Sequence, residues 1–263
     1  MAAFDDLREI LNLASRALEC QAELGHKEII LEKVSPGVAV VEPDEDQPES
    51  ATEVSVMPLP NKEPQSLFGE ETMLTAEPEF ESLDAHLVAI NQCEKCGLCE
   101  SRTNFVYGIG NPHADIMFVG EAPGRDEDLQ GVPFVGRAGK LLDKILEAMK
   151  LSRDDVYIAN ILKCRPPGNR DPQPDEMQTC IPYLKEQIRL IRPKFLVALG
   201  RIAAHGLLET TTPLGRLRGQ WHSFDGIPMI VTYHPAALLR FQQYKRPTWE
   251  DMQTLMAEYE RSK

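Results

Sequence analysis

The residues of this chain that are best suited to bind a ligand stand at the ends of short apolar runs. Glu121 follows one run, Asn160 closes a second, and His234 follows the last. The amide of Asn160 offers a donor and an acceptor side by side, which is the pattern that the polar edge of a pyrimidine base requires. A single Asn or His at such a place is more often structural. Three polar residues at three equivalent places favour a binding or catalytic site.

Two glycine-rich turns accompany these residues. The first is GEAPG, residues 120–124, where glycines flanking a proline make a rigid turn that lets the backbone approach a ligand closely. The second is GVPFVG, residues 131–136, which holds Phe134 between turn residues. Taken alone, such a phenylalanine is more often part of the core than a stacking surface for a ligand.

Six cysteines form the other chemically distinctive set, at positions 20, 93, 96, 99, 164 and 180. Cys93 and Cys96 make a C-x-x-C pair, and Cys164 and Cys180 stand 16 residues apart. On spacing alone, four thiolates of this kind suit either Zn²⁺ or a [4Fe–4S] cluster. Cys99 extends the pair to C-x-x-C-x-x-C, which imitates a ferredoxin-type run.

The elements that must position these residues alternate along the chain. Apolar, strand-like runs occupy residues 115–120, 156–160, 195–200 and 229–233, and segments with helical periodicity occupy 138–149, 175–191 and 202–208. Strands separated by helices imply parallel pairing through crossovers. The predicted fold is therefore α/β, with three α/β/α layers and a central, mainly parallel sheet of about four strands.

The 263-residue chain divides by composition into three parts. Residues 1–34 have apolar positions at helical spacing and predict an amphipathic helical segment. Residues 35–81 are rich in Pro, Glu, Asp, Ser and Thr and predict a disordered acidic linker. Residues 82–263, which begin with a short helix at 83–91 and contain the cysteine and strand-end motifs, predict the functional domain.

The formal net charge of −13 arises almost entirely in the first third of the chain. Residues 1–92 carry 5 Lys+Arg and 20 Asp+Glu, whereas residues 93–263 carry 23 and 21. The overall acidity therefore does not exclude a nucleic-acid ligand for the remainder. No stretch approaches the ~18 consecutive apolar residues of a membrane span, and no signal peptide is recognisable, so we expect a cytoplasmic protein.

GEAPG after the first strand and HPAALLR, residues 234–240, resemble the two signature motifs of the family 4, iron–sulfur type, uracil-DNA glycosylases. The phrases GVPFVGRAGKLLDKIL, YIANILKCRPPGNRDPQPDE and LVALGRIAA are also similar to that family. The resemblance runs from about Ile90 to the C-terminus and leaves residues 1–85 unexplained.

The resemblance implies roles for the residues after the strands. Phe134 would stack on a uracil flipped out of DNA, Asn160 would read its polar edge, and His234 would support charge on its O2 as the glycosidic bond breaks. Glu121 and Glu127 would shape the pocket and position water.

The same resemblance assigns the residues around these. Gly120 and Ala122 would contact the substrate, and Ala122 stands where better-known uracil glycosylases place a water-activating Asp. Leu238 or Leu239 would wedge into the base stack, with Arg240 on a phosphate. The alternative for this segment is a helix start that packs on the core.

For the cysteines, the resemblance implies a structural [4Fe–4S] cluster held by Cys93, Cys96, Cys164 and Cys180. The family pattern does not use the third cysteine of the run, so Cys99 is expected to be a spare thiol. Cys20 has no partner by spacing and is expected to be free.

The expected function is excision of uracil from single- or double-stranded DNA in base excision repair, by a monomer without metal chemistry. The acidic N-terminal region could bind a protein partner. One alternative is a uracil-DNA binder without turnover, but the related proteins that trap the sugar use a histidine on a basic insertion, and residues 165–179 contain no His. Another is an iron–sulfur redox or sensor protein, which leaves GEAPG and HPAALLR unexplained.

Overall fold

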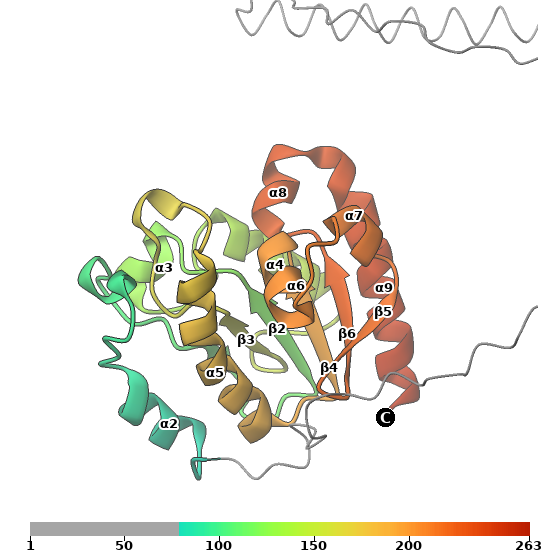
Figure 1. Cartoon of the computed structure of the whole chain (residues 1–263). Coiled ribbons are helices and arrows are strands. Elements are labelled where there is room, and N and C mark those ends of the chain that lie inside the picture. The colour runs from blue at the N-terminus through green and yellow to red at the C-terminus, as the bar shows by residue number, and fades with distance from the viewer. Residues whose placement is uncertain (1–78) are drawn as a thin grey trace, which may run out of the picture. The chain divides into compact units, whose positions relative to one another are not determined.

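The computed structural model describes residues 79–263 (Figure 1). The predicted N-terminal helical segment, residues 1–34, lies outside the described residues. So does the predicted acidic linker, apart from residues 79–81.

A six-stranded mixed sheet forms the centre of the described domain, in the order β1-β3-β2-β4-β6-β5. Its four inner strands are parallel: β2 (Ile116–Gly120), β3 (Tyr157–Asn160), β4 (Phe195–Leu199) and β6 (Ile227–Thr232). The predicted α/β class and its four parallel strands are confirmed. Two short antiparallel edge strands, β1 (Ile109–Gly110) and β5 (Trp221–Phe224), complete the sheet.

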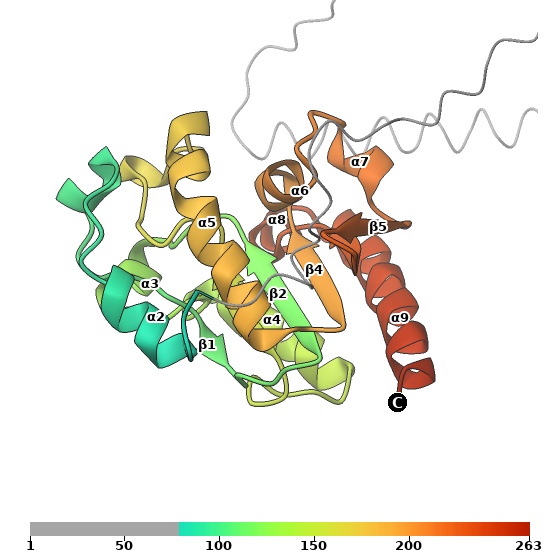
Figure 2. The same ribbon diagram turned by 60° about the horizontal axis from the view of Figure 1, so that its bottom comes forward.

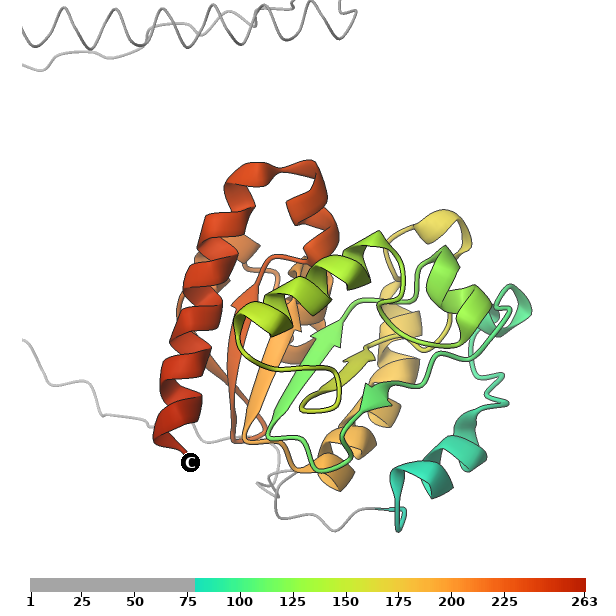
Figure 3. The same ribbon diagram turned by 180° about the vertical axis from the view of Figure 1, so that it is seen from behind.

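Helices cover both faces of the sheet, as the three-layer prediction requires. One face packs against α5 (Pro174–Ile191) and α6 (Arg201–Leu208). The other packs against α4 (Arg137–Ala148) and α9 (Lys245–Arg261), which lie in front of the sheet in Figure 3. Alternation along each strand divides its side chains between two cores, so that in β2 Met117 and Val119 face one core while Ile116 and Phe118 face the other.

Short elements complete the domain. Helix α2 (Leu83–Ile90) begins at Ser82, whose side chain accepts a hydrogen bond from the Ala85 N–H, and it matches the short helix predicted there. Figure 2 shows α2 and β1 at one edge of the domain and β5 and α9 at the other. The remaining elements are η1 (Gly97–Glu100), α3 (Arg125–Gln130), η2 (Pro167–Asn169), α7 (Leu214–Leu217), α8 (Pro235–Arg240) and η3 (Gln242–Tyr244).

The strand order determines where a ligand can bind. From β2 the chain continues to β3 on one side, and after β4 it forms β5 and β6 on the other. Connections that diverge in this way leave a crevice at the carboxyl ends of the two strands. Among the described residues, no helix is both long and apolar enough to span a membrane.

Candidate active site

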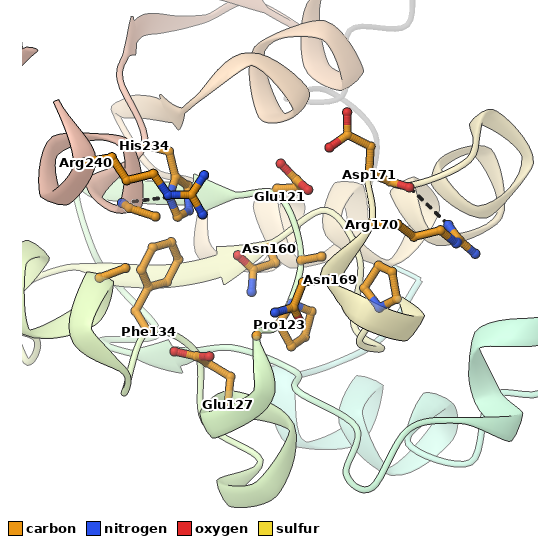
Figure 4. A pocket seen from close by; sticks show the side chains of 15 residues that line it. Glu121, Pro123, Glu127, Phe134, Asn160, Asn169, Arg170, Asp171, His234 and Arg240 are labelled. Atoms are coloured by element: carbon orange, nitrogen blue, oxygen red, sulfur yellow. Dashed lines mark hydrogen bonds between the residues drawn. The ribbon is translucent and has the colours of Figure 1, made fainter. Parts of the chain in front are cut away.

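A cavity of about 360 Å³ lies at the carboxyl ends of the parallel strands (Figure 4). It collects most of the site residues predicted from the sequence. Those that line it are Glu121, Ala122, Glu127, Phe134, Asn160, His234 and Arg240.

Asn160 lines the cavity, whereas Gly120, predicted to contact the substrate, lies beside it and is not among the lining residues. They are register partners at the ends of β2 and β3. A Cβ on residue 120 would lie 2.3 Å from Asn160 Oδ1 and 2.7 Å from Phe134 Cζ, so only glycine leaves room for both side chains. Asn160 is 2% exposed, and its Oδ1 is a buried acceptor without a hydrogen-bond partner. A buried polar atom of this kind is costly unless a ligand supplies the missing donor.

The loop that carries Phe134 is held in a strained conformation. Phe134 is buried with φ of 55°, a region that bulky residues rarely adopt. Arg153 stabilises the loop by donating to the carbonyl oxygens of Pro133 (3.1 Å) and Phe134. A Cβ at Gly139, in the first turn of α4, would lie 1.7 Å from the Phe134 carbonyl oxygen, so the loop can pack here only against a glycine. Such over-determined strain is typical of functional sites.

Glu127 braces the same loop from α3. Its Oε1 accepts hydrogen bonds from the backbone N–H groups of Val135 (3.0 Å) and Gly136 (2.9 Å). One oxygen of this carboxylate is therefore committed to holding the loop.

His234 lines the cavity next to Phe134. The two rings are stacked, with centroids 5.5 Å apart and an interplanar angle of 29°. Burial lowers the pKa of His234 to about 4, against a smaller opposing influence of Glu127, so the imidazole is neutral at pH 7. Its Nδ1 accepts a hydrogen bond from the Ala236 N–H at 3.1 Å, which assigns the ring proton to Nε2. The site therefore holds a neutral N–H donor.

Glu121 lines the cavity as a half-buried carboxyl group with a raised pKa. Burial raises its pKa to about 7, and nearby Asp171 adds to this, while Arg201 opposes it. Asp171 and Arg201 form an ion pair of 2.6 Å at the exposed rim. A carboxyl group with such a pKa changes its charge near neutral pH.

Comparisons with known proteins identify the family. Residues 107–253 match the model of the uracil DNA glycosylase superfamily. A type-4 uracil-DNA glycosylase of Archaeoglobus fulgidus is 47% identical over 185 residues, covering 67% of this chain and 92% of that protein. Those of Saccharolobus solfataricus and Thermotoga maritima are 44% and 42% identical, covering 65% and 62% of this chain and 84% and 88% of theirs. This chain belongs to the type-4 uracil-DNA glycosylases.

The four cysteines predicted as ligands in this type-4 uracil-DNA glycosylase share one region of the fold. Cys164 and Cys180, the latter on α5 itself, are buried in the core, and Cys93 and Cys96 pack against that core. Cys99, half-buried in η1, is not among the cysteines packed there. Among residues 79–263, no group of three or more His, Cys, Asp or Glu side chains is arranged to hold a single metal ion.

Polar side chains surround these thiols. The Tyr183 hydroxyl donates to Cys93 Sγ at 3.1 Å. The Arg102 guanidinium donates to Cys164 Sγ at 3.4 Å and to the Cys93 carbonyl oxygen at 2.6 Å. Burial raises the pKa of Cys180 to about 12, against a smaller lowering influence of Lys163, so this thiol is protonated at pH 7 when it is not bound to a metal.

The two leucines of helix α8 that were predicted as a possible wedge differ in their burial. Leu238 is 2% exposed and belongs to the buried core, whereas Leu239 is 37% exposed. The alternative of a helix start packed on the core therefore applies to Leu238, and neither leucine lines the cavity. Arg240 is exposed and lines the cavity mouth.

One wall of the cavity, formed by the loop after β3, was not predicted from the sequence. Pro166, Asn169, Arg170 and Asp171 line the cavity from this loop. Arg170 holds it to buried Glu176 through two hydrogen bonds of 2.9 and 2.6 Å. Its position in the sequence could have predicted this, because a loop that directly follows the strand ending at Asn160 must start at the same edge of the sheet.

Proposed function

We propose that this protein hydrolyses the N-glycosidic bond between uracil and deoxyribose in DNA, releasing uracil and leaving an abasic site for base excision repair. The observation that carries the proposal is that Asn160, Phe134 and His234 line one cavity in a chain of the type-4 uracil-DNA glycosylases. The cavity is large enough for a single base, and a base must leave the duplex to enter it.

Base recognition rests on Asn160 and Phe134. The unpartnered Asn160 Oδ1 accepts the N3–H of uracil, and the amide nitrogen donates to O4. Cytosine presents an unprotonated N3 and an amino group at the same places, so it mismatches both contacts. Phe134 supplies an aromatic face for the base, on a loop fixed by Arg153 and Glu127.

Bond cleavage leaves the bonding electrons on the base, where they are shared between N1 and O2, and develops positive charge on the sugar. The neutral His234 donates its Nε2–H to O2 and stabilises the leaving anion. A water molecule then adds to C1′, and the proton that it loses ends, through the solvent, on the uracil anion. We assign the orientation of this water to ionised Glu121, because Ala122 has no carboxylate and one Glu127 oxygen is committed to the loop.

For the cysteines, we propose that Cys93, Cys96, Cys164 and Cys180 hold a [4Fe–4S] cluster. Their shared location beside α5 supports this, and a cluster is larger than one ion, so its four thiolates need not converge to single-ion distances. Arg102, next to two of them, offsets negative charge. When bound, the cluster supplies folding free energy by joining segments that are far apart in sequence.

The wider organisation is proposed in the same way. Residues 82–263 form the glycosylase domain, acting as a cytoplasmic monomer on single- or double-stranded DNA. Of the DNA-contacting residues, Leu239 is the wedge, because Leu238 is buried. The acidic N-terminal region binds a protein partner.

A uracil-release assay tests the function. The purified protein is incubated with a labelled oligonucleotide that contains one uracil. We expect free uracil and an intact strand that breaks only after alkali treatment. A protein that binds the oligonucleotide without releasing uracil would be a binder, and a protein that does neither would contradict the proposed function.

A further inference from the structure

Three exposed residues of different character follow one another at the end of α8. Leu239 is 37% exposed, Arg240 lines the cavity mouth, and Phe241 is 47% exposed. Phe241 caps α8 with an extended backbone (φ −128°, ψ 98°), so its ring lies beyond the helix. An exposed aromatic side chain therefore stands directly beside the cavity residue Arg240.

The ring of Phe241 rests on a fixed aromatic support. Its centroid is 5.5 Å from that of Tyr244, which stacks on Tyr233 at 4.1 Å with an interplanar angle of 10°. The Arg218 guanidinium lies 5.6 Å from the Tyr233 ring centroid and forms a 2.7 Å ion pair with buried Asp251. This arrangement holds Phe241 from one side and leaves nearly half of the side chain exposed.

Three exposed cationic residues lie within five positions of Phe241 in the sequence. Arg240 precedes it, and Lys245 and Arg246 follow at the start of α9. The Arg246 side chain is 90% exposed and contacts Glu250 at 3.1 Å. Cations near an exposed aromatic ring are the combination that binds single-stranded nucleic acid, because the cations attract phosphates and the ring stacks on a base.

We propose that Phe241 is a stacking site for the base next to the uracil on the same DNA strand. Flipping one base breaks its stacking on both neighbours, and an exposed aromatic ring on the residue that follows the cavity-lining Arg240 can replace one of these lost contacts. The enzyme then holds two nucleotides, the uracil in the cavity and its neighbour on Phe241. This inference rests on the proposed function and adds a second base site to it.

The test combines a protein change with a DNA change. Single-stranded oligonucleotides carry one hydrolysis-resistant deoxyuridine analogue whose 5′ or 3′ neighbour is either a normal nucleotide or an abasic one. Dissociation constants are measured by fluorescence anisotropy for the full chain and for Phe241→Ala, Phe241→Leu and Phe241→Trp. Val88→Ala serves as a matched control, because Val88 is 74% exposed on α2.

We expect Phe241→Ala to weaken binding about fivefold or more with normal neighbours, which is the scale of one base–aromatic stack. On one side of the uracil, replacing the neighbouring nucleotide with an abasic one should abolish this difference in affinity between Phe241→Ala and the wild type. Phe241→Trp should bind like the wild type, Phe241→Leu like the alanine variant, and Val88→Ala unchanged.

Equal losses on normal and abasic DNA, on both sides of the uracil, would overturn the stacking site, as would full affinity in Phe241→Leu. Because the readout is binding, it stays separate from uracil release. If the wild type releases uracil but the effect of Phe241→Ala does not depend on the neighbouring base, only the Phe241 site is refuted.

Discussion

Gly120 and Asn160 are register partners at the ends of two parallel strands, and a Cβ on residue 120 would lie 2.3 Å from the Asn160 side-chain oxygen. Gly120→Ala should therefore displace the Asn160 amide or the Phe134 ring. We expect kcat/KM for uracil release to fall at least about tenfold, with a loss of about 1–3 kcal/mol in the free energy of unfolding. Steady-state kinetics and urea denaturation measure both, and near-normal kinetics would show that the site tolerates the methyl group.

Asn160→Asp should change which base is accepted. A carboxylate cannot donate to uracil O4, whereas it can accept from the amino group of cytosine. We expect slower release of uracil and new release of cytosine, measured with two oligonucleotides that differ in one base. Unchanged uracil kinetics with no gain on cytosine would remove Asn160 from base recognition.

His234→Ala should remove the donor to the leaving base. The expected loss in the single-turnover rate is about 10²-fold or more, which is the scale for one oxyanion-type donor. Because the wild-type imidazole is already neutral, the rate should show no titration of His234 between pH 6 and 8. A variant with a nearly normal rate would make His234 structural only.

Glu121 should give the activity a pH dependence near neutrality. Its pKa of about 7 means that the ionised fraction, and with it the single-turnover rate, rises as pH increases through 7. Glu121→Gln should be slower and should lose this rise. A Gln variant with the wild-type profile would assign the water to another group.

The same pKa predicts an effect of opposite sign on stability. The folded state binds the Glu121 proton more tightly than the unfolded state, whose carboxyl has a pKa near 4.5. Its contribution to stability is therefore complete below pH 4.5 and is lost as pH rises through 7. Measuring the free energy of unfolding of the wild type and of Glu121→Gln across this pH range separates the contribution of Glu121 from that of other groups.

The cysteines should divide into two classes. Cys164→Ser and Cys180→Ser should lose the brown colour of the iron–sulfur cluster and much of their solubility. The reason is that binding of the cluster contributes to the free energy of folding. Cys99→Ser and Cys20→Ser should keep both colour and activity. Anaerobic measurement of iron and acid-labile sulfide per chain decides the assignment, and a cluster lost in Cys99→Ser but kept in Cys180→Ser would reverse it.

Much of the fold could be predicted from the chain because its inner strands are buried on both faces. Such strands form continuous apolar runs, as in residues 116–119 and 195–199, and they stand out from the amphipathic helices between them. Helix α9 shows the same helical spacing in Trp249, Met252 and Leu255, yet it was not among the predicted helices. The edge strand β1 has two residues and leaves no periodic signal.

The site was predictable where a residue stands at a strand end. Asn160, Glu121 and His234 meet because parallel strands present their carboxyl ends at one edge. The buried state of Leu238 and the bracing of the Phe134 loop by Arg153 could not be predicted in this way. They depend on how α8 packs and on contacts between residues 19 or 20 positions apart.

The two antiparallel edge strands also govern how this protein can meet other copies of itself. Each parallel strand is hydrogen-bonded on both sides, β3 to β1 and β2, and β6 to β4 and β5. The parts of β3 and β6 that these strands cover therefore present no open backbone to another chain. In the described domain, the outermost strands available for intermolecular strand addition have only two and four residues. The sheet that supports the cavity is thus protected from edge-to-edge aggregation by its own outermost strands.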